Sequence, residues 1–549
     1  MKNELCRLFE SVSDGGTLTL RKGATYHVRP EDSYDLTGCY CSNTASIAEN
    51  PLGSRNAAMY LRGRKNVTVD GNGATVLVHG KMTPFLFDRC ENVTVKDLTV
   101  DYACPTMTEF TVLSNDGGVC LLRFAPDSRF RTEGDRLFFR GEDKEDSTPY
   151  WEQASDADRR FVIIYDPEKQ LCRGIGSDKL SFTEVQRLDA RTVRVRLKDP
   201  GADFEPGCVF QSRNIVRDQS GALFQRCRNL VFERLRVRFM HGLGMVSQFC
   251  ENVSFRDCDF TPGEGRTAAS TADFFQFSGC RGVLLIENCI ARGAHDDYIN
   301  VHGTHLRIVE MSGDRRVLTV RFMHKETWGL QAYEAGDRLE FIRGDTLRPY
   351  GEAVVEAFEK LGDTDVRLLL DRPAPEDTAV GRDAVENATW TPDLYVRGCD
   401  FGATHGRGVL CTTRGRVVIE NNRFFHLSDA ALVIEDDCNF WFESGYTTDV
   451  TFRNNEVVGC NSSLVCDGAP VIRVSPKVLD ENSGGFVHGR LTVSGNVFRQ
   501  PCTGRHTIRL EYLARAEISG NTFDAPFTVS AHRSGDILIE NNSVPQEPV

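Results

Sequence analysis

A short phrase that recurs along the chain constrains its fold more than any other feature of the sequence. Each copy follows a β-rich segment and consists of a small polar residue, then Cys or Asn, any residue, and an apolar residue. The copies are Asp257-Cys258-Asp259-Phe260, Asn288-Cys289-Ile290-Ala291, Gly398-Cys399-Asp400-Phe401, Asn421-Asn422-Arg423-Phe424, Asn454-Asn455-Glu456-Val457, Gly495-Asn496-Val497-Phe498, Gly520-Asn521-Thr522-Phe523 and Asn541-Asn542-Ser543-Val544. Among adjacent copies, 23 residues separate Cys399 from Asn422 and 25 separate Asn496 from Asn521. Periods in this range are typical of solenoids.

The residues around each phrase distinguish between types of solenoid. Segments such as Val417-Val418-Ile419-Glu420 alternate with the period of a strand, and the fixed leucine spacing of leucine-rich repeats is absent. Asparagine tolerates left-handed backbone at a turn, and asparagines on stacked coils can bond to one another as a ladder. We therefore expect an all-β protein whose main body is a right-handed parallel β-helix.

The cysteines fit the same repeat. The chain contains 19 of them, an odd number that cannot pair completely within one chain. Cys258, Cys289 and Cys399 occupy the position that asparagine takes in other copies of the phrase. This spacing predicts buried thiols that pack as small hydrophobic residues in a reducing compartment, rather than a disulfide framework. Cys39 and Cys41 are the nearest approach to a zinc-binding pair, and they lack the C-x-x-C spacing.

Two stretches, about 103–215 and 305–390, contain no copy of the phrase and resemble each other. Gly134-Asp135-Arg136-Leu137 in the first echoes Gly336-Asp337-Arg338-Leu339 in the second. Short alternating runs with turn signals and no helical period predict small antiparallel β-barrels inserted into coil loops, often on the binding face. The expected organisation is N-terminal coils at 1–102, a barrel-like insertion at 103–215, central coils with the functional site at 216–304, a second barrel-like insertion at 305–390, and C-terminal coils at 391–549.

Charge and hydropathy exclude several classes of partner. The formal net charge is −13 and no Lys/Arg run could follow phosphates, so we expect no nucleic acid. No stretch approaches 18 uncharged apolar residues, so we expect no membrane span. The N-terminus has neither the basic region nor the unbroken apolar region of a signal peptide. We expect a cytoplasmic protein as written, or a secreted or periplasmic one if an export signal was trimmed.

The segments 271–276 and 294–303 hold the most unusual side chains. Asp273 and Asp297 lie 24 residues apart, one coil, as do Gln276 and Asn300. We therefore expect the two aspartates to stack, with Asp296 beside them. Gln248 lies 28 residues before Gln276, which predicts the same column one coil earlier. Alternation with Ile299 and Val301 in the interior predicts that Tyr298, Asn300 and His302 face outward as a polar stripe.

Three carboxylates in one column suit glycoside hydrolysis. That reaction commonly needs one carboxyl group protonated as general acid and another ionised as base or nucleophile. Neighbouring carboxylates raise one another's pKa, and adjacent coils lie ~4.8 Å apart, within the span of one glycosidic linkage. The competing interpretation of Asp273, Asp296 and Asp297 is a calcium site or solvated turn aspartates.

The arrangement T-A-D-F-F-Q-F-S-G-C, I-E-N-C and H-D-D-Y-I-N-V-H-G over residues 271–303 resembles glycoside hydrolase family 110. These are exo-acting α-1,3-galactosidases of the blood-group-B-cleaving type, with β-barrels inserted in a parallel β-helix. The resemblance extends from the strand that begins at Gly15 to the terminal coils. It implies an inverting mechanism in which Asp296 is the acid, while Asp273 and Asp297 hold and activate water.

The resemblance thus implies an exo-acting, inverting α-galactosidase, without metal or organic cofactor. Its partner would be an oligosaccharide or glycoconjugate with terminal α-1,3-linked galactose, of the blood group B or the linear Gal-α-1,3-Gal type. The sequence leaves open the branch preference and the oligomeric state, homo-oligomers included. An acid and base pair of this type should lie ~6.5–9.5 Å apart, whereas ~5 Å would indicate retention.

Two other functions compete with this one. A polygalacturonase-like pectinase shares the β-helix, the Asp-Asp pair and the His-Gly. It usually carries Asn-x-Asp where this chain has Thr271-Ala272-Asp273, and its Arg-x-Lys has no counterpart here beyond Arg414-Gly415-Arg416. A non-catalytic carbohydrate-binding β-helix would not need three carboxylates in one column.

Several further side chains are candidates for substrate contact. The set expected to bind the sugar is Gln248, Gln276, Asn300, His302, His241 and Glu435. His305 is an alternative hydroxyl ligand, and Trp390 and Trp441 are candidate platforms for the apolar face of galactose. Arg213 and Arg217, at the exit of the first insertion, could help to wall a pocket. The competing role is a structural turn for His302 and His305, a solvated acidic turn for Glu435, and a core or barrel position for Trp390 and Trp441.

Overall fold

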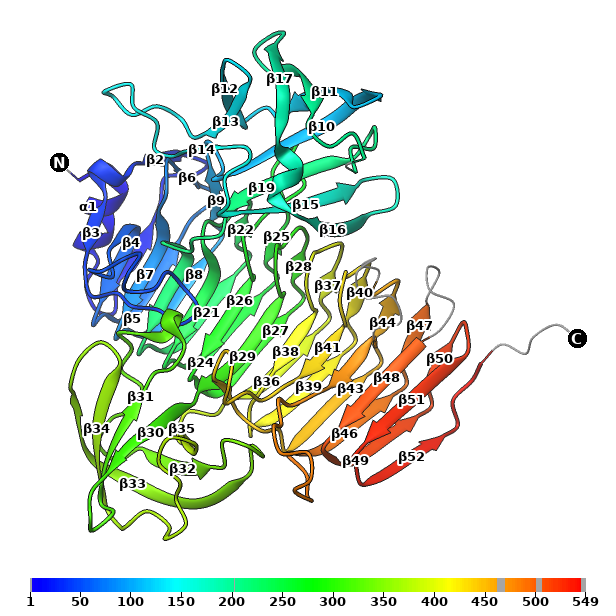
Figure 1. Ribbon diagram of the computed structural model, residues 1–549. Coiled ribbons are helices and arrows are strands. Elements are labelled where there is room, and N and C mark those ends of the chain that lie inside the picture. Colours follow the sequence, from blue (N-terminus) through cyan, green and yellow to red (C-terminus); the bar gives the residue numbers. More distant parts are fainter. Residues whose placement is uncertain (1, 202, 462–469, 500–505, 545–549) are drawn as a thin grey trace, which may run out of the picture.

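The protein folds into a parallel β-helix with three long sheets, named A, B and C below, and two insertions flank sheet C (Figure 1). The computed structural model describes residues 2–201, 203–461, 470–499 and 506–544. Helix α1 (Glu4–Ser11) lies against the first coils near the N-terminus, and its start is capped by Asn3, whose side chain accepts a bond from the Cys6 amide. Among the described residues, no helix is long and apolar enough to cross a membrane.

Three long sheets form the faces of the β-helix, and most coils contribute one strand to each sheet. Sheet A contains β1 (Thr17–Thr19), β5 (Lys65–Asp70), β8 (Glu91–Lys96), β21 (Arg228–Glu233), β24 (Glu251–Arg256), β27 (Arg281–Glu287), β36 (Asp393–Arg397), β39 (Arg416–Glu420), β43 (Asp449–Arg453), β46 (His488–Ser494), β49 (Leu513–Ser519) and β52 (Asp536–Glu540). Sheet B contains β2 (Thr25–Val28), β6 (Thr75–Val78), β9 (Thr99–Tyr102), β22 (Arg236–Val237), β25 (Asp259–Phe260), β28 (Ile290–Ala291), β37 (Asp400–Phe401), β40 (Arg423–Phe425), β44 (Glu456–Val458), β47 (Val497–Arg499) and β50 (Thr522–Phe523).

Sheet C carries the functional site. It contains β3 (Tyr34–Leu36), β4 (Arg55–Arg62), β7 (Thr83–Asp88), β20 (Ser220–Gln225), β23 (Leu243–Gln248), β26 (Phe275–Ser278), β29 (Ile299–Thr304), β38 (Val409–Cys411), β41 (Leu432–Ile434), β45 (Ile472–Val474), β48 (His506–Glu511), β51 (Phe527–His532) and the short β42 (Glu443–Ser444). Its pairings are parallel except for β3 with β4 and β29 with β42. The expected parallel β-helix is therefore confirmed.

The predicted asparagine ladder is present and holds the turn between sheets A and B. Asn422, Asn455, Asn496, Asn521 and Asn542 each lie one coil from the next, and each amide donates to the following asparagine oxygen at 2.9–3.1 Å. The same oxygens accept backbone amides, so that the carboxamides satisfy the turn of the neighbouring coil. The first residue of each phrase supplies the left-handed backbone, for example Asn454 at φ 53°.

The cysteines are packed as the sequence predicts. The 17 within the described residues are all buried and free, and two, Cys466 and Cys502, lie outside those residues. Cys258, Cys289 and Cys399 fill the turn position one coil after another and donate to backbone carbonyls.

Both insertions border sheet C. Along the chain, the first directly precedes a strand of this sheet and the second directly follows one. The first leaves after β9 and returns at β20; the second leaves after β29 and returns at β36. The first contains β10 (Met107–Asp116), β11 (Val119–Phe124), β12 (Arg129–Glu133), β13 (Arg136–Arg140), β14 (Glu152–Ala154), β15 (Arg160–Asp166), β16 (Leu171–Ile175), β17 (Phe182–Arg187), β18 (Thr192–Leu197) and β19 (Val209–Asn214). They form a seven-stranded and a three-stranded antiparallel sheet around one apolar core.

The second insertion is a closed barrel. Its strands are β30 (Leu306–Met311), β31 (Val317–Arg321), β34 (Asp365–Leu370), β33 (Pro349–Lys360), β32 (Arg338–Ile342) and β35 (Ala384–Asn387), in barrel order. Three short 3-10 helices, η1 (Pro30–Asp32), η2 (Ser177–Leu180) and η3 (Lys325–Thr327), complete the regular elements of the described residues.

Candidate active site

The predicted carboxylate cluster lies where two adjacent coils enter sheet C. β26 and β29 pair with Gln276 opposite Asn300, and the amide of Phe274 donates to the Asp297 carbonyl at 3.0 Å. The register places Asp273 beside Asp297, as their 24-residue spacing predicts. One carboxylate oxygen from each of Asp273, Asp296 and Asp297 lies within 4.8 Å of the other two.

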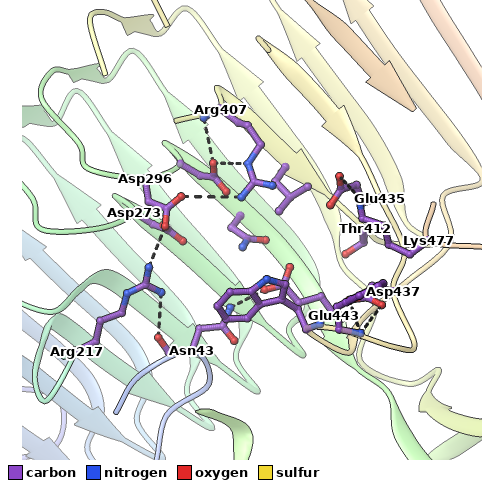
Figure 2. A pocket seen from close by; sticks show the side chains of 15 residues that line it. Asn43, Arg217, Asp273, Asp296, Arg407, Thr412, Glu435, Asp437, Glu443 and Lys477 are labelled. Carbon is purple, nitrogen blue, oxygen red and sulfur yellow. Dashed lines mark hydrogen bonds and ion pairs between the residues drawn. The ribbon is translucent and has the colours of Figure 1, made fainter. Parts of the chain in front are cut away.

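The three aspartates line a cavity of about 620 Å³ on the outer face of sheet C (Figure 2). Its other walls come from strands β29 and β38, the segments that follow β41 and β45, the loop that leads to β42, and a loop near the N-terminus. The lining residues are Asn43, Arg217, Asp273, Asp296, Asp297, Asn300, Arg407, Leu410, Thr412, Glu435, Asp437, Phe440, Trp441, Glu443 and Lys477. Acidic and amide oxygens dominate this lining, so the cavity is suited to a ligand with many hydroxyl groups.

Two arginines balance part of the negative charge. Arg407 donates to Asp297 Oδ1 through its Nε at 2.6 Å and its backbone amide at 3.1 Å. Arg217 donates to Asp296 Oδ2 at 2.9 Å and to the Asn43 carbonyl at 3.3 Å. The guanidinium groups thus hydrogen-bond one oxygen of Asp296 and one of Asp297, and the second oxygen of Asp297 has no partner among the described residues.

Burial and mutual repulsion perturb the two inner carboxyls. The pKa of Asp273 is raised well above its usual value by burial and by the neighbouring charges of Asp296 and Asp297. Burial also raises the pKa of Asp297 to about 7, although the Arg407 guanidinium opposes the shift. Near neutral pH the inner pair therefore holds a proton. Asp296 differs in environment, because about a third of its side chain is exposed, at 35%.

The limit of 4.8 Å applies to the nearest oxygen of each carboxylate. The ~6.5–9.5 Å typical of an inverting acid and base, and the ~5–5.5 Å of retaining pairs, are separations between carboxyl groups. The separation expected for an inverting acid and base therefore stays a prediction.

Comparison with known proteins shows what the chain is related to. It is 32% identical over 541 residues to "Alpha-1,3-galactosidase A" of Bacteroides fragilis, covering 95% of this chain and 82% of the relative. The chain belongs to the α-1,3-galactosidase family. "Alpha-1,3-galactosidase B" of Bacteroides thetaiotaomicron is 30% identical, covering 93% of this chain and 80% of the relative.

The family's barrel is recognisable in the second insertion. The family "GLAA-B beta-barrel domain II" matches residues 317–385, most of the closed barrel. A solved structure, "Siphovirus 9NA tailspike receptor binding domain", covers all of this chain and 76% of its own, with 9% identity and a TM-score of 0.26, too weak a likeness to inform the site. The resemblance to glycoside hydrolase family 110 that the motifs predict is confirmed by the galactosidase relatives.

Some of the expected substrate ligands line the cavity, and others lie beneath it. Asn300 and Glu435 line the cavity, and the buried Asn300 Oδ1 has no partner among the described residues. Gln276 lies behind Asn300 and donates to His302 Nε2 at 2.6 Å, while His302 Nδ1 bonds the Gly303 carbonyl. Gln276 and His302 therefore brace the stripe from one coil to the next.

Other expected contacts lie elsewhere. Gln248 pairs with Ser278 and not with Gln276, so the predicted column is wrong. The long turn at 261–274 shifts the register between the two coils. The Gln248 side chain instead forms hydrogen bonds with the backbone of Ser42 and Tyr40. Tyr298, predicted to face outward, is instead fully buried between Phe274 and Phe401, because it precedes β29, where strand alternation has not begun.

Three more candidates lie away from the cavity. His241 bonds Thr106 and Asp218 at 2.6 Å each, and so joins the first insertion to the coils. His305 is fully buried against Asp436. Trp390, at the end of the second insertion, packs on Phe249 of the coils. The other candidate platform, Trp441, does line the cavity.

Sequence reasoning missed the residues that complete the site. Leu410 pairs with Asn300, so Arg407 and Asp297, each three residues earlier, occupy equivalent positions on adjacent coils. The second insertion separates these two coils in sequence, and the regular spacing that would show the equivalence is lost. The N-terminal loop brings Asn43 to Glu443, 400 residues away in sequence, with a bond of 2.6 Å. No local pattern signals such a contact.

Proposed function

We propose that this protein is an exo-acting α-galactosidase that hydrolyses terminal α-1,3-linked galactose from oligosaccharides or glycoconjugates. The observation that carries the proposal is the convergence of three carboxylates, two of them buried with raised pKa values, in a cavity lined by hydroxyl-binding groups. Membership of the α-1,3-galactosidase family supports the sugar and the linkage. The insertions on both sides of sheet C favour a pocket that takes a chain end.

The environments of the three aspartates suggest a division of labour. Asp296 is the most exposed and lies at the edge of the cavity, where it can give a proton to the glycosidic oxygen. Asp297 is fixed through Oδ1 by Arg407, which leaves Oδ2 free to accept a proton from water. Asp273 keeps a proton through its raised pKa and can orient the same water.

The activity test compares three substrates: linear Gal-α-1,3-Gal, a fucosylated group-B trisaccharide, and polygalacturonate as control. Galactose release from either galactoside supports the proposal, and the ratio of the two rates gives the branch preference. Cleavage of polygalacturonate alone would replace it with a pectinase, and no cleavage of any substrate would favour a carbohydrate-binding protein.

The stereochemical outcome is a separate measurement. Proton NMR of the first product should show β-galactose if water attacks opposite the leaving group, as the family resemblance implies. Initial α-galactose would mean retention.

A further inference from the structure

A second cavity opens on the other side of Asp296. It has a volume of about 630 Å³ and shares Arg217, Asp296, Arg407 and Trp441 with the first cavity. Its own walls include Phe161 and Arg213 from the first insertion, and His295 and His405 from the coils. If Asp296 protonates the glycosidic oxygen, the leaving group lies on this side, so the second cavity is the leaving-group subsite; this assignment rests on the proposed function.

Arg213 is a buried cation that lacks a direct ion pair within the described residues. It is 6% exposed on β19, and no carboxylate of the described residues forms an ion pair with it. Its guanidinium lies over the Phe161 ring at 4.8 Å and donates to the Asn214 carbonyl at 3.2 Å, while its Nε has no partner. Burial and the neighbouring charge of Arg217 lower the pKa of Arg213 to about 9, although the more distant charges of Asp296 and Asp273 oppose the shift. An unpaired buried charge is destabilising unless a partner arrives.

The neighbouring arginines do not share this deficit. Arg217 and Arg407 are paired with Asp296 and Asp297. Arg160 also lacks a carboxylate, but it bonds Ser212 and Gln153 at 2.8 and 2.9 Å and lies outside the lining of this cavity.

The three acidic groups of the second cavity are already engaged or neutral. Asp296 pairs with Arg217 at 2.9 Å, and Asp429 faces Arg473 at 3.4 Å. Burial raises the pKa of Glu326, which favours its neutral form. None of the three forms an ion pair with Arg213 within the described residues.

His295 offers the complementary group. It is 2% exposed, and its Nε2 lies 2.9 Å from Gln211 Oε1, whose own amide donates to Thr267. His295 therefore donates through Nε2, and Nδ1 is left as an acceptor with no partner. Burial and Arg213 hold the pKa of His295 well below its usual value, so the ring stays neutral. Such a cavity presents a donor for an anion, an acceptor for a hydroxyl, and an aromatic face.

We propose that the second cavity binds a leaving-group sugar that carries an anionic substituent, a sulfate ester or a carboxylate, paired with Arg213. The substrate class of the enzyme then includes acidic glycans with a neutral terminal α-galactose. A charge-assisted bond to a buried guanidinium should favour the anionic sugar about tenfold or more over its neutral counterpart.

The test uses the full chain and two independent readouts. The first is kcat/KM for Gal-α-1,3-Gal in which the reducing galactose is unmodified, sulfated at position 2, 4 or 6, or oxidised to galacturonate. The second is calorimetric binding of galactose, the three galactose sulfates and galacturonate alone, which needs no hydrolysis. The sulfate and carboxylate arms separate the two sources of the anion.

We expect at least one anionic substrate to exceed the neutral one about tenfold in kcat/KM, and the matching monosaccharide to bind more tightly than galactose. In Arg213→Gln that ratio should fall to about one, and Arg213→Lys should retain part of it. Arg160→Gln is the matched control for loss of a buried arginine and should keep the ratio.

Other outcomes separate the two proposals. Equal rates and equal binding for neutral and anionic sugars, or a preference unchanged in Arg213→Gln, would overturn the anionic subsite. Tighter binding of an anionic monosaccharide without galactose release from any substrate would retain the subsite and overturn the proposed function. Absence of both would overturn both.

Discussion

Asp297→Asn should remove activity and at the same time change how stability depends on pH. Asp297 is 1% exposed, and its pKa is raised from 3.8 to about 7. A carboxyl with a raised pKa in the folded state binds its proton more tightly there than in the unfolded chain. The wild type therefore loses stability as pH rises from about 4 to about 7, by about 1.36 kcal/mol for each pH unit between the unfolded and the folded pKa.

The magnitude follows from the distance between these two pKa values. Between pH 4.5 and pH 8.5 the wild type should lose about 3 kcal/mol through Asp297, and Asp297→Asn should not. For a cooperative chain of 549 residues, the entropy of unfolding makes this about 3 °C in Tm. The difference in Tm, variant minus wild type, should thus increase by about 3 °C over that range, whatever its sign at pH 4.5.

The assay is thermal unfolding of both proteins across this pH range, followed by fluorescence, with galactose release measured on the same samples. Activity should fall at least ~10²-fold at every pH. Parallel Tm curves would refute the assignment of a high pKa to Asp297, and full activity would remove Asp297 from the mechanism.

Three further predictions test other parts of the structure. Asp273→Asn and Asp296→Asn should each lower kcat at least ~10²-fold without lowering Tm below that of the wild type at pH 8; wild-type rates in either would exclude that carboxyl from the chemistry. With Asp297 as base, kcat/KM of the wild type should rise with pH through about 7, and a fall there would instead make Asp297 the acid. Asn496→Ala should lower the free energy of unfolding by about 2–4 kcal/mol, because it removes the bonds to Asn521 and leaves the amide groups of Asn455 without their acceptor. The control Asn482→Ala, in an exposed turn, should leave Tm unchanged. Equal Tm values for both variants would contradict a structural role for the ladder.

The regular parts of this protein are readable from sequence because a β-helix repeats its geometry. A 24-residue step is enough to place Asp273 beside Asp297 and Gln276 opposite Asn300, and both relations hold. Errors arise where the repeat is interrupted. The register of Gln248 fails because the turn that follows its coil is longer than its neighbours.

Orientation and charge balance are harder to predict than position. Tyr298 does not follow the alternation that the sequence predicts, because the strand begins one residue later. Arg217 and Arg407 oppose the raised pKa values of the cluster. Each is separated from its aspartate in sequence by long segments of other structure. Side chains brought together across such distances depend on how the intervening segments fold.

The pairing of Asp297 with Arg407 also has a consequence for the order in which the active site is synthesised. The carboxylate and its guanidinium are 110 residues apart, and the whole second barrel is made between them. At ~5–20 residues per second, a ribosome needs about 5–20 s to deliver the arginine after the aspartate. During that interval the emerging coils carry three crowded carboxyls without one of their two cations, and the cavity wall from Leu410 to Lys477 is made only after the arginine.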